Sequence, residues 1–329
     1  MQDALSPILV TGGAGYVGAH LVRHLRSRNC DVVVVDDLSN GRRPRLPDDV
    51  PVYETCIGRV DEITRILRKH RCRTVVHLAA SKSVAESVRD PLVHYRNNLS
   101  NSVALLEACT AADIRQFLFA SSAAVYGDVP GGIVTEDANP LPKSPYGISK
   151  KMFEDVLQSS VEHYGMTYAI LRLFNVAGRG AFMAHEDIAG SEPSLLDALA
   201  ACRVRAGNTD KIEFQILGND YDTEDGTCER DLIHIDDVTE AFWRSLLHIA
   251  ETGKNLVVNC GSGTSRSVKQ IVHRFRDRHA PSITPVYAPR RNGDIAKICA
   301  DISAFKHATG WEPVHSELDK ILVSISEPS

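Results

Sequence analysis

The amino-acid sequence predicts an α/β fold in which a doubly wound parallel sheet carries a second, smaller α/β lobe. Short apolar runs alternate with segments of helical periodicity, which is the pattern of strand–helix–strand units in a parallel sheet. The run Val32–Val35 is entirely β-branched, as in strands that are buried on both faces. The first run, Ile8–Thr11, stops at a cluster of glycines, after which helical periodicity begins.

The first half of the chain gives a regular series of elements. The segment Tyr16–Arg28 is expected to be a helix because Val17, Leu21, Val22 and Leu25 share one side. The other expected helices are Ile63–Lys69, Pro91–Ala112 and Tyr146–Tyr164, and the further strands are Thr74–Leu78, Phe117–Ser121 and Tyr168–Phe174. Right-handed crossovers follow from this order.

After Asn175 the pattern becomes irregular. The Gly-rich segment Val176–Glu192 has no clear period and predicts a loop, as does the polar segment Gly218–Thr227. The helices expected here are Pro193–Arg205, Val238–Ala250 and Ser267–Asp277, and the strands are Leu232–Ile235 and Leu256–Cys260. We therefore expect residues 1–177 to form the large domain, to which 232–258 return, and 178–231 with 259–329 to form the smaller one.

Composition excludes several classes of protein. A chain of 329 residues with 43% apolar and 24% charged residues is typical of a globular protein of about two domains. The net charge of -5 gives no electrostatic reason to expect nucleic-acid binding. No apolar run approaches the roughly 20 residues that cross a bilayer, and Met1–Pro7 lacks the features of a signal peptide. We expect a cytoplasmic protein without a membrane partner.

The cysteines do not indicate a metal or dithiol site. All eight are scattered, with no Cys-x-x-Cys arrangement and no paired histidine spacing beside them. We therefore expect reduced thiols and no metal.

The glycine cluster predicts a dinucleotide site. Thr11–Gly18 satisfies Gly-x-Gly-x-x-Gly through Gly13, Gly15 and Gly18, and Gly-x-x-Gly-x-x-Gly through Gly12, Gly15 and Gly18. It lies between a predicted strand and a predicted helix, whose amide groups and dipole favour phosphate. Asp36 follows the second strand, where a carboxylate binds ribose hydroxyls and repels a 2′-phosphate. NAD is thus favoured over NADP, although Arg42 and Arg43 could reach a phosphate.

A second motif indicates acid–base chemistry. Pro145 can open a helix, and Tyr146 and Lys150 are then one turn apart on one face. A tyrosine titrates near ~10, and a nearby ammonium group lowers this pKa. The pair is therefore a candidate catalytic base and its partner, whereas a surface tyrosine beside a solvated lysine is the alternative.

These motifs, in this order, carry a resemblance to a known family. The glycine fingerprint, Ser121–Gly127 (SSAAVYG) and Tyr146-x-x-x-Lys150 resemble the extended short-chain dehydrogenase/reductase superfamily and, within it, the UDP-glucose 4-epimerase family. The resemblance runs from about Ile8 to about Trp311. Its most specific strings are His77–Ser87 (HLAASKSVAES), Gly218–Ile235 (GNDYDTEDGTCERDLIHI) and Ala288–Asp294 (APRRNGD).

The resemblance implies a Rossmann-type NAD domain, a smaller UDP-sugar domain and named roles for residues. Tyr146 would be the catalytic base, Lys150 its partner, and Ser122 the hydroxyl that bonds the reacting sugar oxygen. The implied cofactor-binding residues are Gly12, Gly15, Tyr16, Val17, Gly18, Asp36, Asp37, Leu38, Ser39, Asn40, Cys56, Ile57, Leu78, Ala79, Ala80, Lys82, Asn97, Ser122, Tyr146, Lys150 and Phe174. The implied substrate-binding residues are Lys82, Ser122, Ala123, Ala124, Tyr146, Asn175, Ser194, Leu195, Leu196, Gln215, Ile216, Arg230, Arg291, Asp294 and Ile298.

The sequence departs from the family pattern at four places. Cys56 replaces the usual Asp that contacts the adenine amine, and Ala124 replaces a Thr or Ser that touches the sugar. Ser194 precedes Leu195 where an Asn is usual, so one contact to uridine is in doubt. Ile298 stands where some members have a bulky Tyr, and smaller residues there are associated with N-acetylated sugars.

The implied reaction is a 4-epimerisation that uses tightly bound NAD. Tyr146 would take the sugar 4-hydroxyl proton, a transient 4-keto sugar would turn over, and UDP-glucose and UDP-galactose, or their N-acetylated forms, would interconvert. Epimerisation of a UDP-uronic acid or UDP-pentose is an alternative. A 4,6-dehydratase or decarboxylase would need acid–base groups where Ala123 and Ala124 stand, and a non-catalytic NAD-binding regulator would not require Tyr146 and Lys150. The resemblance also implies a homodimer, joined through Pro91–Ala112 and Tyr146–Tyr164.

Overall fold

A seven-stranded parallel sheet is the centre of the structure, a computed structural model that describes residues 5–180, 194–206, 211–290 and 294–326. The strand order is β3-β2-β1-β4-β5-β7-β11, and every neighbouring pair is parallel. The bounds are β1 Ile8–Thr11, β2 Val32–Asp36, β3 Val52–Glu54, β4 Thr74–His77, β5 Gln116–Ser122, β7 Thr167–Leu173 and β11 Leu256–Cys260. The expected doubly wound parallel sheet is therefore confirmed.

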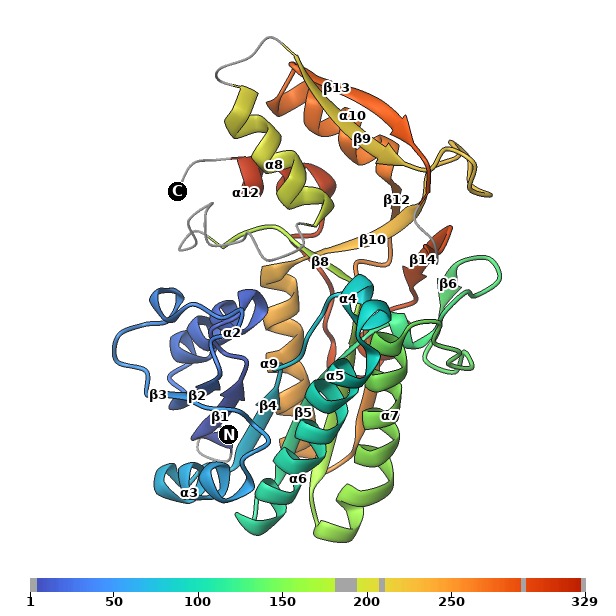
Figure 1. Cartoon of the computed structure of the whole chain (residues 1–329). Coiled ribbons are helices and arrows are strands. Elements are labelled where there is room, and N and C mark those ends of the chain that lie inside the picture. The colour runs from blue at the N-terminus through green and yellow to red at the C-terminus, as the bar shows by residue number, and fades with distance from the viewer. Residues whose placement is uncertain (1–4, 181–193, 207–210, 291–293, 327–329) are drawn as a thin grey trace.

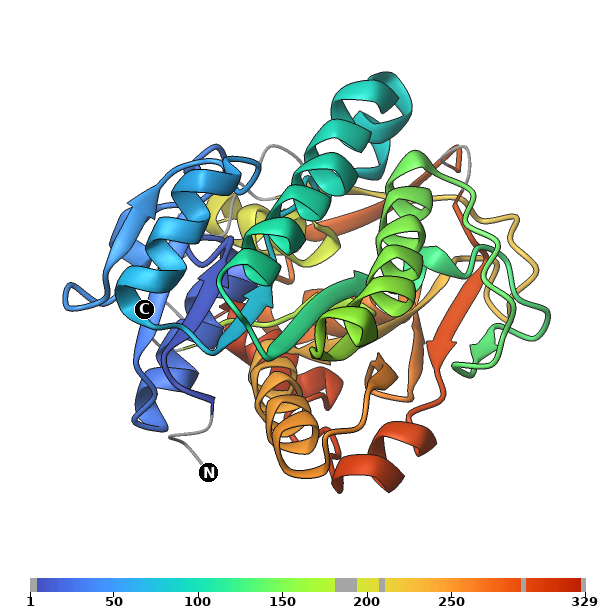
Figure 2. The same ribbon diagram turned by 90° about the horizontal axis from the view of Figure 1, so that it is seen from below.

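Helices cover both faces of this sheet, as Figure 2 shows. One face carries α3 (Val60–His70), α6 (Asn101–Ala111) and α7 (Pro145–Ser160), and the other carries α2 (Tyr16–Ser27), α9 (Ile235–Thr252) and α11 (Ser303–Thr309). Successive strand residues alternate between the two faces, so that Leu9 and Val33 pack with α3 and α6 while Ile8 and Val10 pack with α2 and α9. Burial on both faces explains the unbroken apolar runs.

The expected helix Pro91–Ala112 is present but is not uniform. It consists of α5 (Pro91–Tyr95), a π-helical turn at Arg96–Ser100, and α6. Helical backbone angles at Tyr95 and Asn101 keep the three parts continuous. A short helix that the sequence pattern did not predict, α4 (Val84–Arg89), precedes them and is capped by the Ser83 side chain.

The smaller lobe is built around β10 (Glu229–His234), which lies in the upper half of Figure 1. β10 pairs in parallel with β8 (Asn175–Ala177) and β14 (Lys297–Ala300), and antiparallel with β12 (Ser265–Ser267). The other elements are β6 (Ile133–Val134), which pairs with β14, the parallel pair β9 (Ile212–Leu217) and β13 (Ile283–Ala288), and helices α8 (Leu195–Ala206), α10 (Val268–His279) and α12 (Leu318–Ser326). A separate apolar core joins these helices to β9.

Strands β8 and β10 also differ from the sequence prediction. Strand β8 falls partly inside the segment expected to be a loop, Val176–Glu192, whose residues from 181 on lie outside the described part. Three residues are too few to show a period, and β8 exists because it pairs with β10. Strand β10 belongs to the smaller sheet, whereas α9 and β11 complete the large one. The proposed domain boundaries stay a prediction.

Within the described residues, no helix combines the length and apolar character needed to cross a membrane.

Candidate active site

The carboxyl ends of the strands of the large sheet lie along one edge, because all of these strands run in the same direction. The site residues expected from the sequence follow these ends. The glycine turn follows β1, Asp36 ends β2, the segment Leu78–Ala80 follows β4, Ser122 ends β5, and Phe174 follows β7. The chain reverses its strand order between β1 and β4, and this is the point where open α/β sheets bind ligands.

The glycine turn is packed so closely that side chains would not fit. Gly12 has φ +68, and a Cβ on it would lie 2.7 Å from the Ala79 nitrogen. A Cβ on Gly18 would lie 2.1 Å from the Gly12 carbonyl oxygen. Helix α2 begins after Gly15, and no side chain caps its N terminus or places an acid in its first turn. Its first amide groups are thus suited to an anion such as a pyrophosphate.

Asp36 is held at the edge of this turn. Its carboxylate accepts hydrogen bonds from the Ala14 nitrogen (2.9 Å) and the Leu38 nitrogen (2.9 Å). Burial raises its pKa, against the effect of these two bonds. A carboxylate offers about four acceptor positions, so two remain for ribose hydroxyls. The following loop turns through Asp37, whose carboxylate accepts from the nitrogen and hydroxyl of Ser39, and on to Asn40.

Arg42 and Arg43, which the sequence left open as possible phosphate ligands, differ in their contacts. The Arg43 guanidinium donates to carbonyls of its own loop, those of Leu46, Pro47, Asp48 and Val50. The Arg43 guanidinium therefore stabilises its own loop and is already engaged in hydrogen bonds. Arg42 lies beside Gly41 and donates its backbone nitrogen to the Ala14 carbonyl at 3.0 Å.

Cys56, which replaces the family's usual Asp, follows β3 beside Ile57. Its sulfur accepts from the Gly58 nitrogen at 3.4 Å and from the Asn101 side-chain amide at 3.5 Å. Asn101 comes from the first turn of α6, far along the sequence. Sequence reasoning missed Asn101, because no local pattern joins it to Cys56.

The segment after β4 is fixed to the glycine turn and to the π-helical turn. The Thr11 hydroxyl lies 3.3 Å from the nitrogens of Leu78 and Ala79, and Asn97 donates to the Ser81 hydroxyl at 2.7 Å. Asn98, a residue that the sequence did not single out, bonds both the nitrogen and the carbonyl of Ser81. A π-helical turn often marks a functional site, and here it presents two successive asparagines to one loop. Ala80 and Lys82 belong to that loop, and the Lys82 side chain is exposed.

The structure brings the expected catalytic residues together. Ser144 caps α7 through the Gly147 nitrogen, and Pro145 occupies the first turn. Tyr146 is hydrogen-bonded to the Ser122 side chain. Lys150 is buried, donates to the Ala120 carbonyl at 2.8 Å, and lies 6.0 Å from the centre of the Tyr146 ring. The ring of His94 packs edge-on against Tyr146 at 5.9 Å, a contact that the sequence did not predict.

The pKa of Tyr146 differs from the prediction. Burial raises the pKa of Tyr146, and its hydrogen bond with Ser122 lowers it less than burial raises it. Burial also lowers the pKa of Lys150 to about 7, although the charge of Glu154 opposes this. The expected lowering by Lys150 is thus not seen, because burial disfavours both charged forms. The residues are in place, but the protein alone does not favour the phenolate.

Three expected residues form one wall beside Ser122. Ala123, Phe174 and Ile298 pack in a single buried apolar cluster, although they come from β5's end, β7's end and β14. Ala124 donates its nitrogen to the Ser122 hydroxyl at 3.2 Å. A Cβ on Gly147 would lie 2.4 Å from the Ala124 carbonyl oxygen, so this wall fits closely against the start of α7.

The residues expected to hold UDP lie on the smaller lobe. Arg230 and Asp294 form an ion pair at 3.6 Å, and Arg230 stands opposite Ile298 in the β10–β14 register. Asn175 pairs with Leu232 at the start of β8. Ser194 caps α8 with Asp197, Leu195 and Leu196 follow it, and Gln215 and Ile216 lie on β9. Leu196 and Ile216 are buried in the lobe's core, and Arg291 lies outside the described residues.

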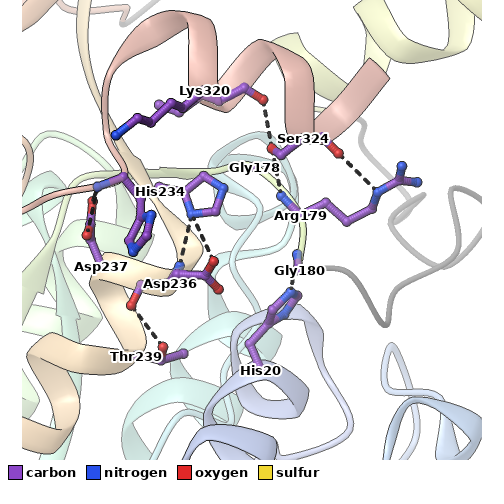
Figure 3. Close-up of polar contacts among 12 residues, drawn as sticks. His20, Gly178, Arg179, Gly180, His234, Asp236, Asp237, Thr239, Lys320 and Ser324 are labelled. Atoms are coloured by element: carbon purple, nitrogen blue, oxygen red, sulfur yellow. Dashed lines mark hydrogen bonds and ion pairs between the residues drawn. The ribbon is translucent and has the colours of Figure 1, made fainter. Parts of the chain in front are cut away.

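Hydrogen bonds join helix α2 to the segment Gly178–Gly180, which leads into the smaller lobe (Figure 3). The Tyr16 hydroxyl donates to the Gly178 carbonyl at 2.5 Å, and the Gly180 nitrogen donates to His20 Nε2 at 2.9 Å. Arg179 bonds the Ser324 hydroxyl and carbonyl on α12. The Tyr16 side chain is thus used within the protein, and contact of residues 16 and 17 with a cofactor would come from the backbone of Tyr16 and Val17.

These features define a class of protein: a dinucleotide-binding α/β enzyme with a tyrosine–lysine–serine site. Residues 8–261 match the NAD dependent epimerase/dehydratase family, and the chain belongs to this family. The family and its NAD dependence, expected from the sequence, are therefore confirmed.

The particular relatives are UDP-sugar 4-epimerases. The chain is 40% identical over 324 residues to a UDP-glucose 4-epimerase of Azospirillum brasilense, covering 98% of this chain and 92% of the relative. A solved UDP-glucose 4-epimerase of Stenotrophomonas maltophila, with NAD and formylated UDP-arabinopyranose bound, has a TM-score of 0.88 at 31% identity, covering 97% and 96% of the two chains. The UDP-Glc/GlcNAc 4-epimerase of Campylobacter jejuni has a TM-score of 0.83 at 33% identity, covering 97% and 98%.

Proposed function

We propose that this chain is an NAD-dependent UDP-sugar 4-epimerase that interconverts UDP-glucose and UDP-galactose. The observation that carries the proposal is the contact between Tyr146 and Ser122, with buried Lys150 on the same face of α7. NAD fits the glycine turn, the uncapped start of α2 and Asp36, as described above. When bound, NAD supplies hydride acceptance from the sugar C4 and hydride return.

The protein's own residues move the proton. Tyr146 takes the proton of the sugar 4-hydroxyl and gives it back in the second half of the reaction. Ser122, bonded to Tyr146, shares this proton path and stabilises charge on the sugar oxygen. The protein alone does not favour the phenolate, and the positive nicotinamide of bound NAD would act together with charged Lys150 to favour it. Arg230 and the backbone of the smaller lobe hold the nucleotide, since arginine suits diphosphate oxygens.

The site favours epimerisation over dehydration. A 4,6-dehydratase needs a further acid and base beside the serine, and positions 123 and 124 are alanines. Ala123 is buried in the wall with Phe174 and Ile298, so position 123 brings no ionisable group to the site. The medium-sized Ile298 leaves N-acetylated sugars open as further substrates.

Proton NMR of the products from a panel of UDP-sugars tests this function. UDP-glucose, UDP-N-acetylglucosamine, UDP-glucuronic acid and UDP-xylose would each be incubated with the purified protein. The expected result is formation of the 4-epimer from UDP-glucose, with no loss of water. A 4-keto-6-deoxy product would establish a dehydratase instead. Retention of NAD without any product would identify a non-catalytic NAD-binding protein.

We further propose that two copies associate through the helices α4, α5 and α7. Exposed apolar side chains gather on these helices, namely Val84, Val88, Leu92, Val93 and Met152. Several exposed apolar side chains on neighbouring helices are typical of an interface. Light scattering at micromolar concentration should give the dimer mass, and Leu92→Glu should give the monomer. Val314→Glu, at an exposed valine that lies beside α9 and not on these helices, is the control and should leave the dimer intact.

The cytoplasmic location and the division into an NAD domain and a UDP-sugar domain stay predictions. The smaller lobe has an apolar cluster separate from the two clusters that cover the faces of the large sheet, and this supports that division.

A further inference from the structure

Three polar residues follow one another along one stripe of α7. Tyr146, Lys150 and Glu154 are spaced four residues apart, so their side chains leave the helix on one side. Each has its own partner at the end of β5, and the partners are consecutive in sequence. These pairs are Tyr146 with Ser122, Lys150 with the Ala120 carbonyl, and Glu154 with Ser121. The third pair, Glu154 with Ser121, lies one helical turn beyond Lys150, and the proposed mechanism uses only Tyr146 and Lys150 of this stripe.

Glu154 is a fully buried and firmly held anion. Its exposed fraction is 0%, and that of Arg172 is 5%. Arg172 forms two parallel bonds to the Glu154 carboxylate, at 3.1 Å and 2.8 Å, and the Ser121 hydroxyl donates a third at 2.5 Å. Burial alone would lower the pKa of Arg172, but the bonds and charge of Glu154 outweigh it and raise this pKa. Arg172 therefore stays charged, and its paired bonds have the geometry that suits a carboxylate.

Arg172 is also held by hydrogen bonds to residues other than Glu154. Arg172 donates to the Tyr126 hydroxyl at 2.8 Å and to the Glu136 carbonyl at 3.2 Å. Tyr126 in turn donates to the Asn259 side chain at 2.7 Å. The ion pair is thus anchored to β7 and β11, and Glu154 cannot move away from α7 and Lys150 without breaking a buried network.

Lys150 faces few charged groups. Tyr146 and Glu154 face it from α7, His94 from α5, His77 from β4, and the Ala120 carbonyl from β5. Burial, with the Lys150 charge adding to it, lowers the pKa of both histidines, to about 3 for His77, so they are neutral. Glu154 is the group among these whose charge opposes the effect of burial on Lys150.

We propose that Glu154 is a positioning residue of the reaction, because it is the buried anion that keeps Lys150 charged beside Tyr146. Arg172 and Ser121 hold the Glu154 carboxylate in place. The assignment of Lys150 as partner of Tyr146 rests on the proposed function. The electrostatic link from Glu154 to Lys150 does not depend on that function, since it follows from their spacing along α7 and from the burial of both side chains.

The test measures the titration of Lys150 directly. In protein labelled with ¹³Cε-lysine, Lys150 is the lysine expected to titrate near neutral pH, and its signal is assigned from the variant Lys150→Met. Glu154→Gln should move this titration to lower pH by about one unit or more, as for two charges one helical turn apart in a protein interior. An unchanged titration would overturn the proposal.

The pH dependence of kcat is the second readout. With Lys150 discharged at lower pH, the alkaline limb of the profile in Glu154→Gln should move to lower pH, with about tenfold less activity at a fixed pH on that limb. A purely structural role would lower kcat at every pH and leave the limb in place. Asp155→Asn is the matched control, because Asp155 pairs with Lys151 on the exposed side of α7 at the same spacing.

Removing Glu154 alone leaves the Arg172 charge buried without its partner, so Glu154→Gln can fail to fold. The double variant Glu154→Gln/Arg172→Met removes both charges together and is expected to fold. It should keep the lowered titration of Lys150, whereas a return to the wild-type titration would show that the pair serves stability only. A wild-type protein without epimerase activity would refute the proposed function, but the NMR titration would still decide the role of Glu154.

Discussion

Gly18 offers a sharp test of the dinucleotide site, because two effects of one methyl group have opposite signs. Gly18 is the third residue of α2, and Ala is favoured over Gly inside a helix by about 1 kcal/mol. The added Cβ, however, would lie 2.1 Å from the Gly12 carbonyl oxygen and 2.7 Å from the Gly13 Cα. Both neighbours are backbone atoms, so the turn itself must move, by about 1 Å to reach ordinary contact distances.

The clash should weaken NAD binding strongly, whereas its effect on the free energy of unfolding is partly offset by the gain in helix propensity. Overpacking typically costs about 1–3 kcal/mol, so after the gain in helix propensity the free energy of unfolding should fall by no more than about 2 kcal/mol. The same displacement moves the amide groups that face the pyrophosphate. Hydrogen bonds weaken steeply with such a shift, and the loss of two, at about 1.5 kcal/mol each, lowers NAD affinity by more than about a hundredfold.

Calorimetric titration of NAD into cofactor-free protein measures this effect, together with a urea unfolding curve. Gly253→Ala is the control, because Gly253 ends α9 at φ +63 and a Cβ there meets nothing within 4 Å. It should cost about 1–2 kcal/mol through backbone strain and leave NAD affinity unchanged. Wild-type NAD affinity in a folded Gly18→Ala protein would refute the assignment of this turn.

Three further predictions follow from the site. Tyr146→Phe should reduce kcat by about 10²–10⁴ through loss of the acid–base group while bound NAD is retained in the purified protein; turnover close to wild type would remove Tyr146 from its proposed role. NADP should bind at least about tenfold more weakly than NAD because Asp36 repels a 2′-phosphate, and Asp36→Asn should narrow the difference in calorimetric titrations. Acid should destabilise the protein through His20, because burial lowers the pKa of His20 to about 4 in the folded protein. In the unfolded chain this histidine takes up a proton near pH ~6.5. The stability present above that pH is therefore lost between pH 6.5 and about pH 4, by up to roughly 3 kcal/mol. Urea unfolding at pH 7 and pH 4.5 measures this loss, which His20→Gln should reduce.

Local sequence patterns account for the parts of the site that depend on a few neighbouring residues. The glycines of Thr11–Gly18 indicate a tight turn before a helix, and the structure has this turn and helix. Tyr146 and Lys150 share a helix face, which helical spacing alone predicts. The parallel sheet then brings both to the edge where Asp36 and Ser122 end their strands.

Contacts between distant segments could not be predicted in the same way. The partner of Cys56 is Asn101, and the partner of Glu154 is Arg172 on β7. Neither pair has a characteristic spacing, so only the assembled fold shows that they meet. The pKa of Tyr146 is a similar case, because a sequence shows the nearby Lys150 but not how completely water is excluded from both.

The return of α9 and β11 to the large sheet has a consequence for the synthesis of the protein. β11 is the edge strand beside β7, and its last residue, Cys260, is made long after β7 ends at Leu173. At about 5–20 residues per second, a ribosome needs roughly 4–17 seconds to make the intervening chain. During that time the face of the nascent sheet that α9 will cover remains apolar and open. Residues 1–177 alone therefore lack α9 and β11, and the seven-stranded sheet is complete only after α8, β9 and β10 of the smaller lobe have been synthesised.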